Sequence, residues 1–292
     1  MSVAAVAQVV ASGLLMGLVY ALIAAGLSLI FGLMDVVNFA HGEFLMVAMY
    51  MTFGLHVLLT LDPLLLLPVV GALMLLFGVV VYRLVIRRAA QAKANVWMAQ
   101  IFVTFGLSIA LRGVAQFLFT PDYRNIKGTW LGNRTIDILG VYLPLAQLAA
   151  AAICLLAFGG LYLLISRTDF GRALEATRED SEAVALVGIN RDLIFALGWG
   201  LGGAAVGIAG VMLSSFYYIY PGVGSTFALI AFITVALGGF GSLAGALVGG
   251  IIIGLVEALT ALFVDPSLKS IGIYAIYMLV VLLRPRGLFG YY

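Results

Sequence analysis

The sequence predicts an all-α fold, a polytopic bundle of transmembrane helices. Hydrophobic residues make up 64% of the 292 residues and charged residues only 10%, whereas ordinary soluble domains hold about 45–50% and about 25%. The apolar runs are long and do not alternate with polar residues, which excludes a transmembrane β-barrel. We expect a single transmembrane domain over residues 1–292, and the lone cysteine, Cys154, excludes an intramolecular disulfide.

Nine apolar segments predict the helices. A helix needs about 20 apolar residues to cross the hydrocarbon core of a bilayer. The first segment follows no basic region or cleavage site, so we expect it to be a retained span rather than a signal peptide. The seventh and ninth segments are short and could be broken or re-entrant, which gives eight to ten spans. The predicted helices cover residues 9–33, 44–61, 64–86, 97–119, 145–165, 193–216, 226–237, 243–264 and 271–283.

Lysine and arginine residues in the short loops predict the orientation, because cytoplasmic loops carry more of them. With nine spans, three strongly basic segments share one side, which we expect to be cytoplasmic and to include the C-terminus. The opposite loops mix basic residues such as Lys269 with Asp122, Asp137 and Asp265. The basic residues on the predicted inner side are Arg83, Arg87, Arg88, Lys93, Arg167, Arg172, Arg178, Arg191, Arg284 and Arg286.

Polar and ionisable side chains interrupt the apolar sequence between the first two predicted helices. Asp35, Asn38, His41 and Glu43 stand in a segment that is too short and too apolar for a solvated loop. Ionisable groups at membrane depth are costly and usually face a cavity or a partner. Transporters also build their sites from helices broken at such points. We expect these residues to line or gate a pathway, with helix capping inside the bundle as the alternative.

A second interruption lies at residues 238–242, where three glycines surround Phe240. Unwound backbone at membrane depth is tolerated where it lines a cavity or is buried in protein, so Gly239 is a further candidate for the pathway. Glycines spaced by four within residues 198–207 and 241–254 predict close helix packing. His41 has no cysteine or second histidine nearby in the sequence, and we therefore expect no metal site.

Two charges lie inside predicted helices, each seven residues from the outer end of its own helix. At 1.5 Å per residue, Arg112 and Glu257 both lie about 10 Å below the outer surface. Charges within the membrane usually find one another, so we expect these two to pair. Alternatively, Arg112 extends to the lipid headgroups and Glu257 faces water in an outer vestibule.

The predicted inner loop at residues 166–192 is long enough to hold structure. Thr168 or Asp169 can cap one short helix, and Asp180 or Ser181 can cap a second, which ends at Gly188. The second helix carries more apolar side chains than a solvated loop needs, and such a surface predicts a partner protein. Those apolar residues are Ala183, Val184, Leu186 and Val187.

The same loop contains Glu182-Ala183-Val184 followed, after three residues, by Gly188. This resembles the Glu-Ala-Ala-x-x-x-Gly loop of ATP-binding-cassette importer permeases, with Val184 replacing the second alanine and the later Ile and Leu-Pro absent. Together with further motifs, nearly the whole chain resembles the LivH-type permeases of the high-affinity branched-chain amino-acid transporters. The other motifs are Gly26-Leu27-Ser28-Leu29-Ile30-Phe31-Gly32, Val37-Asn38-Phe39-Ala40-His41-Gly42-Glu43, residues 238–242, and Arg284-Pro285-Arg286-Gly287-Leu288-Phe289-Gly290.

The resemblance implies a transport subunit in a bacterial inner membrane that carries leucine, isoleucine and valine. Glu182, Ala183 and Gly188 would contact a cytoplasmic ATPase. The chain has no phosphate-binding loop of the G-x-x-x-x-G-K-[ST] type, so we expect no cofactor of its own and no enzyme activity, with ATP bound by two partner subunits. A second homologous permease and an external solute-binding protein are implied as further partners. The net charge of +2 gives no reason to expect nucleic acid.

Two alternatives remain open at this stage. Permeases for urea, short amides or other amino acids resemble the same family and would share these motifs. A proton-coupled secondary transporter belongs to a different class, and Asp35, His41 and Glu43 could form its proton relay. The capped loop at residues 166–192 argues against that class, because a self-sufficient carrier needs no such partner surface.

Overall fold

The computed structural model describes residues 3–91, 95–132, 134–138, 140–180 and 182–290. Lys93 and Ser181, which the sequence analysis assigns to the inner loops, lie outside these residues. The main helices are α1 (Val3–Met34), α2 (His41–Leu59), α3 (Pro63–Val81), α5 (Val96–Phe119), α6 (Leu145–Arg167), α9 (Arg191–Ser214), α10 (Val223–Gly238), α11 (Leu243–Phe263) and α12 (Lys269–Leu283). The short elements are η1 (Tyr82–Ile86), α4 (Arg87–Ala90), β1 (Thr135–Ile138), β2 (Val141–Pro144), α7 (Asp169–Glu179), α8 (Ala183–Leu186) and η2 (Pro266–Leu268).

These helices confirm the predicted fold class. Eight helices in the described ranges are long and apolar enough to cross a membrane, and α10 is a shorter apolar helix. Each of the nine predicted segments corresponds to one of them. The largest difference is α1, which begins six residues before the predicted start at residue 9. The chain is therefore a multi-pass membrane protein.

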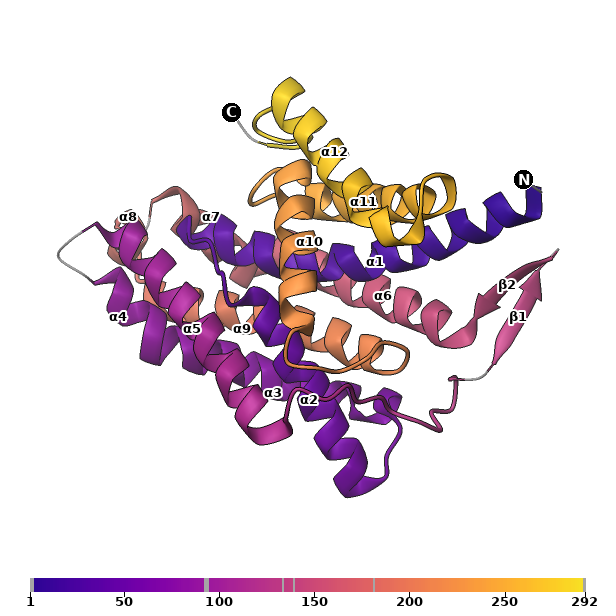
Figure 1. Ribbon diagram of the computed structural model, residues 1–292. Helices are drawn as coiled ribbons and strands as arrows, with labels where there is room; N and C mark the ends of the chain where they lie inside the picture. The colour runs from indigo at the N-terminus through magenta and orange to yellow at the C-terminus, as the bar shows by residue number, and fades with distance from the viewer. Residues whose placement is uncertain (1–2, 92–94, 133, 139, 181, 291–292) are drawn as a thin grey trace.

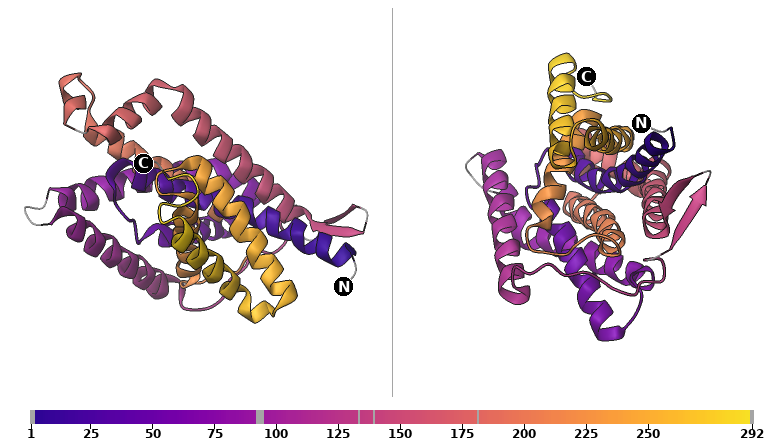
Figure 2. Two further views of the ribbon diagram at one scale, coloured as in Figure 1. Left: turned by 90° about the horizontal axis from the view of Figure 1, so that it is seen from above. Right: turned by 45° about the vertical axis from the view of Figure 1, so that its right-hand side comes forward.

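Helices α1 and α9 form the centre of the bundle. Helix α1 packs along α11, α9 and α6, and α9 packs along α3, α1 and α2. Figure 1 shows α1 running through the length of the molecule, with α10 crossing it steeply. In an apolar stretch of 18 residues, 72% of the residues are buried in α1 and in α9, whereas 11% are buried in α5 and in α12. Figure 2 shows α5 along one edge of the bundle.

Glycines set the close packing of this centre, as the sequence predicts. On α9, an added Cβ at Gly203 would lie 2.6 Å from the carbonyl oxygen of Met74 in α3. On α11, an added Cβ at Gly250 would lie 2.5 Å from the backbone nitrogen of Ala21 in α1. Small residues let helix backbones approach in lipid, where apolar burial alone gives little association.

The loops gather at two ends of the bundle. The β1–β2 hairpin lies near the N-terminal end of α1, and Gln8 exchanges two hydrogen bonds of 2.6 Å with the backbone of Tyr142. Helices α4, α7 and α8 lie at the other end, where Arg87 pairs with Asp192 at 2.8 Å. At this second end, Leu288 and Phe289 donate backbone hydrogen bonds of 2.8 and 2.9 Å to the carbonyls of Leu237 and Gly238. The C-terminal segment thus caps the last turn of α10.

Candidate functional site

The break between α1 and α2 returns the chain into the bundle. Helix α1 ends at Met34, and Asp35 turns the backbone with a φ of 52°. Residues 35–40 are non-helical, and α2 begins at His41. The Nε2 of His41 donates to the carbonyl oxygen of Ile23 at 2.9 Å. Because Ile23 lies 11 residues before the end of α1, α2 starts about 16 Å from that end, inside the bundle.

Asn38 and His41 hold this break in place. Both side chains are fully buried. The Oδ1 of Asn38 accepts a hydrogen bond of 3.0 Å from the backbone nitrogen of Ala40, which closes a local turn before the first turn of α2. Among the described residues, the Nδ2 of Asn38 and the Nδ1 of His41 have no hydrogen-bond partner. Each residue therefore has one structural contact and one unused polar atom.

Helix α10 begins directly against the first turn of α2. A Cβ added to Gly42 would overlap the carbonyl oxygen of Gly224, and a Cβ added to Gly224 would lie 2.7 Å from the carbonyl oxygen of Gly42. Only glycine fits at both positions. Two helix N-termini therefore meet within the bundle, and both present the positive ends of their dipoles.

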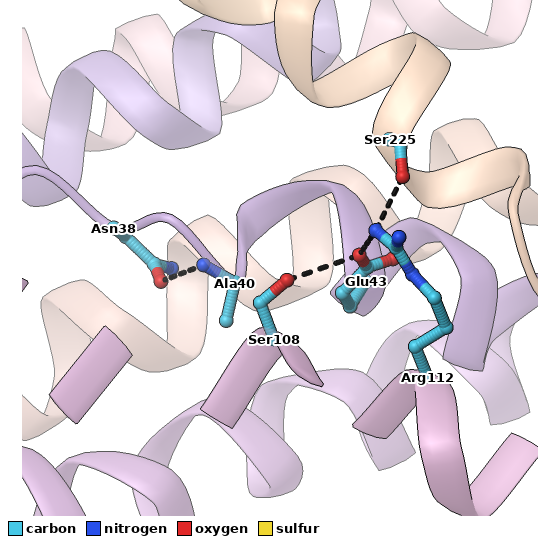
Figure 3. Close-up of polar contacts among 6 residues, drawn as sticks. All are labelled: Asn38, Ala40, Glu43, Ser108, Arg112 and Ser225. Atoms are coloured by element: carbon cyan, nitrogen blue, oxygen red, sulfur yellow. Dashed lines mark hydrogen bonds and ion pairs between the residues drawn. The ribbon is translucent and has the colours of Figure 1, made fainter. Parts of the chain in front are cut away.

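Glu43 places its carboxylate at this meeting point. The residue lies in the first turn of α2 and is 2% exposed. Its Oε1 accepts hydrogen bonds from the Oγ of Ser108 at 3.1 Å and from the Nη2 of Arg112 at 2.5 Å. The same Nη2 also donates to the Oγ of Ser225 on α10. Figure 3 shows α2, α5 and α10 joined through these four side chains.

The predicted pair of Arg112 with Glu257 is wrong. Arg112 pairs with Glu43, and Glu257 pairs with Lys269 at 2.6 Å and accepts a hydrogen bond of 2.6 Å from the hydroxyl of Tyr20. Each charge does have an opposite partner, but a similar depth does not fix the side of the bundle on which a residue lies. Helix α5 packs against α2, while α11 packs against α1, α10 and α12.

The two partners Ser108 and Ser225 were missed by the sequence analysis. A single serine inside an apolar helix carries no signal, because its hydroxyl can bond within its own helix. A signal was nevertheless present on α5, where Gln100, Thr104, Ser108 and Arg112 follow one another at every fourth position. Residues four apart share one face of a helix. This polar face of α5 indicates which of its residues contact buried polar groups of the bundle.

Two other predicted pathway residues lie away from Glu43. Asp35 is exposed at the end of α1. Gly239 directly follows the last residue of α10, about 22 Å along that helix from Gly224, and has a φ of 105°. A Cβ added to Gly239 would lie 2.6 Å from the backbone nitrogen of Gly290. The unwound backbone predicted at residues 238–242 is present, but there it packs against the C-terminal segment.

The loop after α6 has the predicted caps. The Oγ1 of Thr168 accepts from the nitrogen of Gly171 at 3.3 Å at the start of α7. The Oδ1 of Asp180 accepts from the nitrogens of Ala183 and Glu182, both at 2.9 Å. These two hydrogen bonds, with that from Ala183 the stronger influence, lower the pKa of Asp180.

The second helix of this loop is the single turn α8. Gly188 follows it with a φ of 83°, a left-handed conformation that suits glycine. Among the apolar residues here, Val184 is buried, whereas Leu186 and Val187 are 89% and 75% exposed. The predicted apolar surface is therefore present at the tip of the loop.

Comparison with known proteins gives the family. The family described as branched-chain amino acid transport system / permease component matches residues 9–282. The high-affinity branched-chain amino acid transport system permease protein BraD of Pseudomonas aeruginosa is 32% identical, with 97% of this chain and 95% of BraD covered. The LivH permease of the corresponding system of Escherichia coli K12 is 30% identical, with 96% and 94% covered.

No solved structure matches this chain. The family match spans all nine apolar helices, including the break before α2, the inner loop and most of α12. The chain belongs to the family of branched-chain amino acid transport permease components.

Proposed function

We propose that this chain is the membrane-spanning permease subunit of an ATP-driven importer for leucine, isoleucine and valine in a bacterial cytoplasmic membrane. The observation that carries this proposal is the family match over residues 9–282. The contact of the buried Glu43 with the partly exposed Arg112, where the first turns of α2 and α10 meet, supports it. Broken helices whose N-termini face a site near the membrane centre are typical of transporters. A charge within a membrane helix is costly, about 2.5–3.5 kcal/mol for an arginine at the helix centre on insertion scales, so the presence of Arg112 inside α5 calls for a function.

The pathway is proposed to run past the break between α1 and α2. Asn38, His41 and Glu43 would line or gate it, and the unused polar atoms of Asn38 and His41 support this assignment. Asp35 and Gly239 would lie nearer its inner end. The competing interpretation, in which these residues only hold the helix ends, draws on the hydrogen bonds of Asn38 and His41 described above.

The loop that carries α7 and α8 is the proposed contact for the motor. Leu186 and Val187 expose apolar side chains at its tip, and Glu182, Ala183 and Gly188 match the docking motif. Two cytoplasmic ATP-binding subunits would engage this loop and the same loop of a second homologous permease. An external solute-binding protein would deliver the substrate at the other end. In this assembly, the C-terminus lies on the cytoplasmic side.

The test is uptake of radiolabelled leucine by proteoliposomes that hold the complete complex. Uptake should require the binding protein outside and ATP inside, and a non-hydrolysable ATP analogue serves as the matched control. Uptake driven by a proton gradient without the ATP-binding subunits would instead show a secondary transporter. ATP-dependent uptake of urea or short amides in place of leucine would assign the chain to the related permeases.

A further inference from the structure

One face of α5 is polar along most of its length, although the rest of the helix is apolar. Gln100, Thr104 and Ser108 are 5%, 0% and 8% exposed, and Arg112 continues the same four-residue spacing. We name these four residues the α5 stripe. The remaining faces carry exposed apolar side chains, among them Phe102, Phe105, Ile109 and Phe117.

The α5 stripe lies against the break between α1 and α2 and reaches α10. The Oγ1 of Thr104 lies 3.2 Å from the carbonyl oxygen of Val37, and it can also donate to the carbonyl of Gln100 at 3.0 Å. Four and eight residues further along, Ser108 and Arg112 reach Glu43. The stripe therefore covers the non-helical segment and the first turn of α2.

Helix α5 has few buried contacts with the rest of the bundle. An added Cβ at Gly106 or Gly113 of α5 would have no neighbour within 4 Å, whereas glycines of α9 and α11 are tightly enclosed. Apart from the stripe, Ala115 is the one residue of α5 that is buried in the described part of the chain. Few contacts resist a movement of α5 away from the break, and elements with few buried contacts open most easily.

The charges at the end of the stripe are complementary to an α-amino acid zwitterion. The side chain of Arg112 is 38% exposed, whereas that of Glu43 is 2% exposed. A guanidinium binds a carboxylate through two parallel hydrogen bonds, and Arg112 uses only its Nη2 toward Glu43 and Ser225. The Oε2 of Glu43 is buried and has no partner in the described ranges, so it is available to an ammonium group.

Three aromatic rings meet at the break and suit an apolar side chain. Phe39, in the break, contacts Phe105 of α5 with ring centroids 6.4 Å apart and Phe232 of α10 with centroids 5.5 Å apart. Phe39 is itself 37% exposed. The three rings come from the break, α5 and α10, so two of them lie on helices that the polar contacts of Glu43 also join.

We propose that solute passes between the α5 stripe and the break, and that the Glu43–Arg112 ion pair is the closed gate of this path. On opening, Arg112 binds the α-carboxylate and Glu43 the α-ammonium of an amino acid whose apolar side chain lies on the phenylalanines. This inference rests on the proposed function and adds to it one wall of the path and the groups that recognise the substrate.

The test is thiol labelling in the complete reconstituted complex, in a Cys154→Ala background. Thr104→Cys and Ser108→Cys report on the stripe, and Ile109→Cys is the matched control on the exposed apolar face. Gln100→Cys replaces either stripe variant that fails to assemble. Labelling with a membrane-impermeant methanethiosulfonate is compared at rest and during ATP hydrolysis with leucine-loaded binding protein.

Labelling of the stripe should be about tenfold or more faster during turnover, because an open state that is minor at rest is populated at about 10% or less. The Ile109→Cys control should stay unlabelled in both states. Stripe cysteines that remain unlabelled in every state, in variants that still import leucine, would overturn the inference. Failure of the unmodified complex to import leucine would instead overturn the proposed function.

A second measurement addresses the recognition of the carboxylate. Arg112→Lys keeps a positive charge but loses the two-pronged geometry of the guanidinium. The KM for leucine-loaded binding protein should change little, because docking is remote from the site, and kcat for uptake should fall about tenfold or more if two-pronged binding contributes about 1.4 kcal/mol. Equal kcat in Arg112→Lys and the unmodified chain would show that only the charge is needed, as in a purely structural ion pair.

Discussion

Gly42 of α2 and Gly224 of α10 bring two helix starts into backbone contact inside the bundle. A side chain at either position would overlap the opposite backbone or the carboxylate of Glu43. We predict that Gly42→Ala and Gly224→Ala each destabilise the protein by about 1–3 kcal/mol, the usual cost of overpacking. Thermal unfolding of the purified protein measures this change.

The matched control for this prediction is Gly106→Ala on α5. No atom lies within 4 Å of an added Cβ there, and alanine favours a helix over glycine by about 1 kcal/mol. Gly106→Ala should therefore be neutral or stabilising. Equal losses of stability at Gly42, Gly224 and Gly106 would show that the contact of α2 with α10 has no special role.

The ion pair of Glu43 with Arg112 predicts strong coupling in a double-mutant cycle. Glu43→Gln and Arg112→Gln should each lower the free energy of unfolding. The loss in the double variant should be smaller than the sum of the two single losses by about 0.5–3 kcal/mol. The pair Arg112→Gln with Glu257→Gln is the control, and its effects should add because the two residues have different partners. Coupling in the second cycle but not in the first would contradict the contacts described here.

Asp180 predicts how the inner loop responds to pH. Backbone hydrogen bonds hold its pKa below the ordinary value of 3.8. A lowered pKa in the folded state stabilises the loop above about pH 3.8, and this contribution disappears as the pH falls through the lowered pKa. Amide hydrogen exchange at Glu182 and Ala183, corrected for the intrinsic rates, should show constant protection between about pH 5 and 8. Asp180→Asn, which keeps the acceptor oxygen, should retain protection that Asp180→Ala loses.

We predict that a substitution at Gly188 impairs coupling to the ATPase without impairing insertion into the membrane. A β-branched residue is strained at a φ of 83°, and left-handed backbone costs an ordinary residue about 1–2 kcal/mol. Gly188→Val should leave the chain inserted in the membrane and should abolish stimulation of the ATPase by the loaded binding protein. Gly188→Asn should retain much of this stimulation, because asparagine tolerates a left-handed backbone. Full stimulation with Gly188→Val would remove this turn from the docking surface.

Features that depend on a single segment of the chain could be predicted from the sequence. Long apolar runs located the helices, and the polar residues from Asp35 to Glu43 located the break. Thr168, Asp180 and Gly188 fixed the ends of the loop helices, because capping is a local interaction.

The partner of Arg112 could not be predicted in this way. Position along a helix gives depth in the membrane, but the neighbour at that depth depends on how α2, α5 and α10 pack. The return of the chain from Met34 to His41 decides that packing, and no local pattern encodes its path. The backbone contact at Gly224 was hidden for the same reason, since one glycine among the 35 of the chain carries no distinctive signal.

The most direct test of the account compares leucine uptake per ATP hydrolysed between the unmodified complex and the complex carrying Glu43→Gln. Glutamine keeps the size of the side chain and an acceptor for Ser108, but it removes the charge that holds Arg112 and would bind an ammonium group. The account predicts an assembled complex that hydrolyses ATP while uptake per ATP falls about tenfold or more, a change of about 1.4 kcal/mol in the transport barrier. An unchanged ratio would contradict the assignment of Glu43 and Arg112 to the transport pathway.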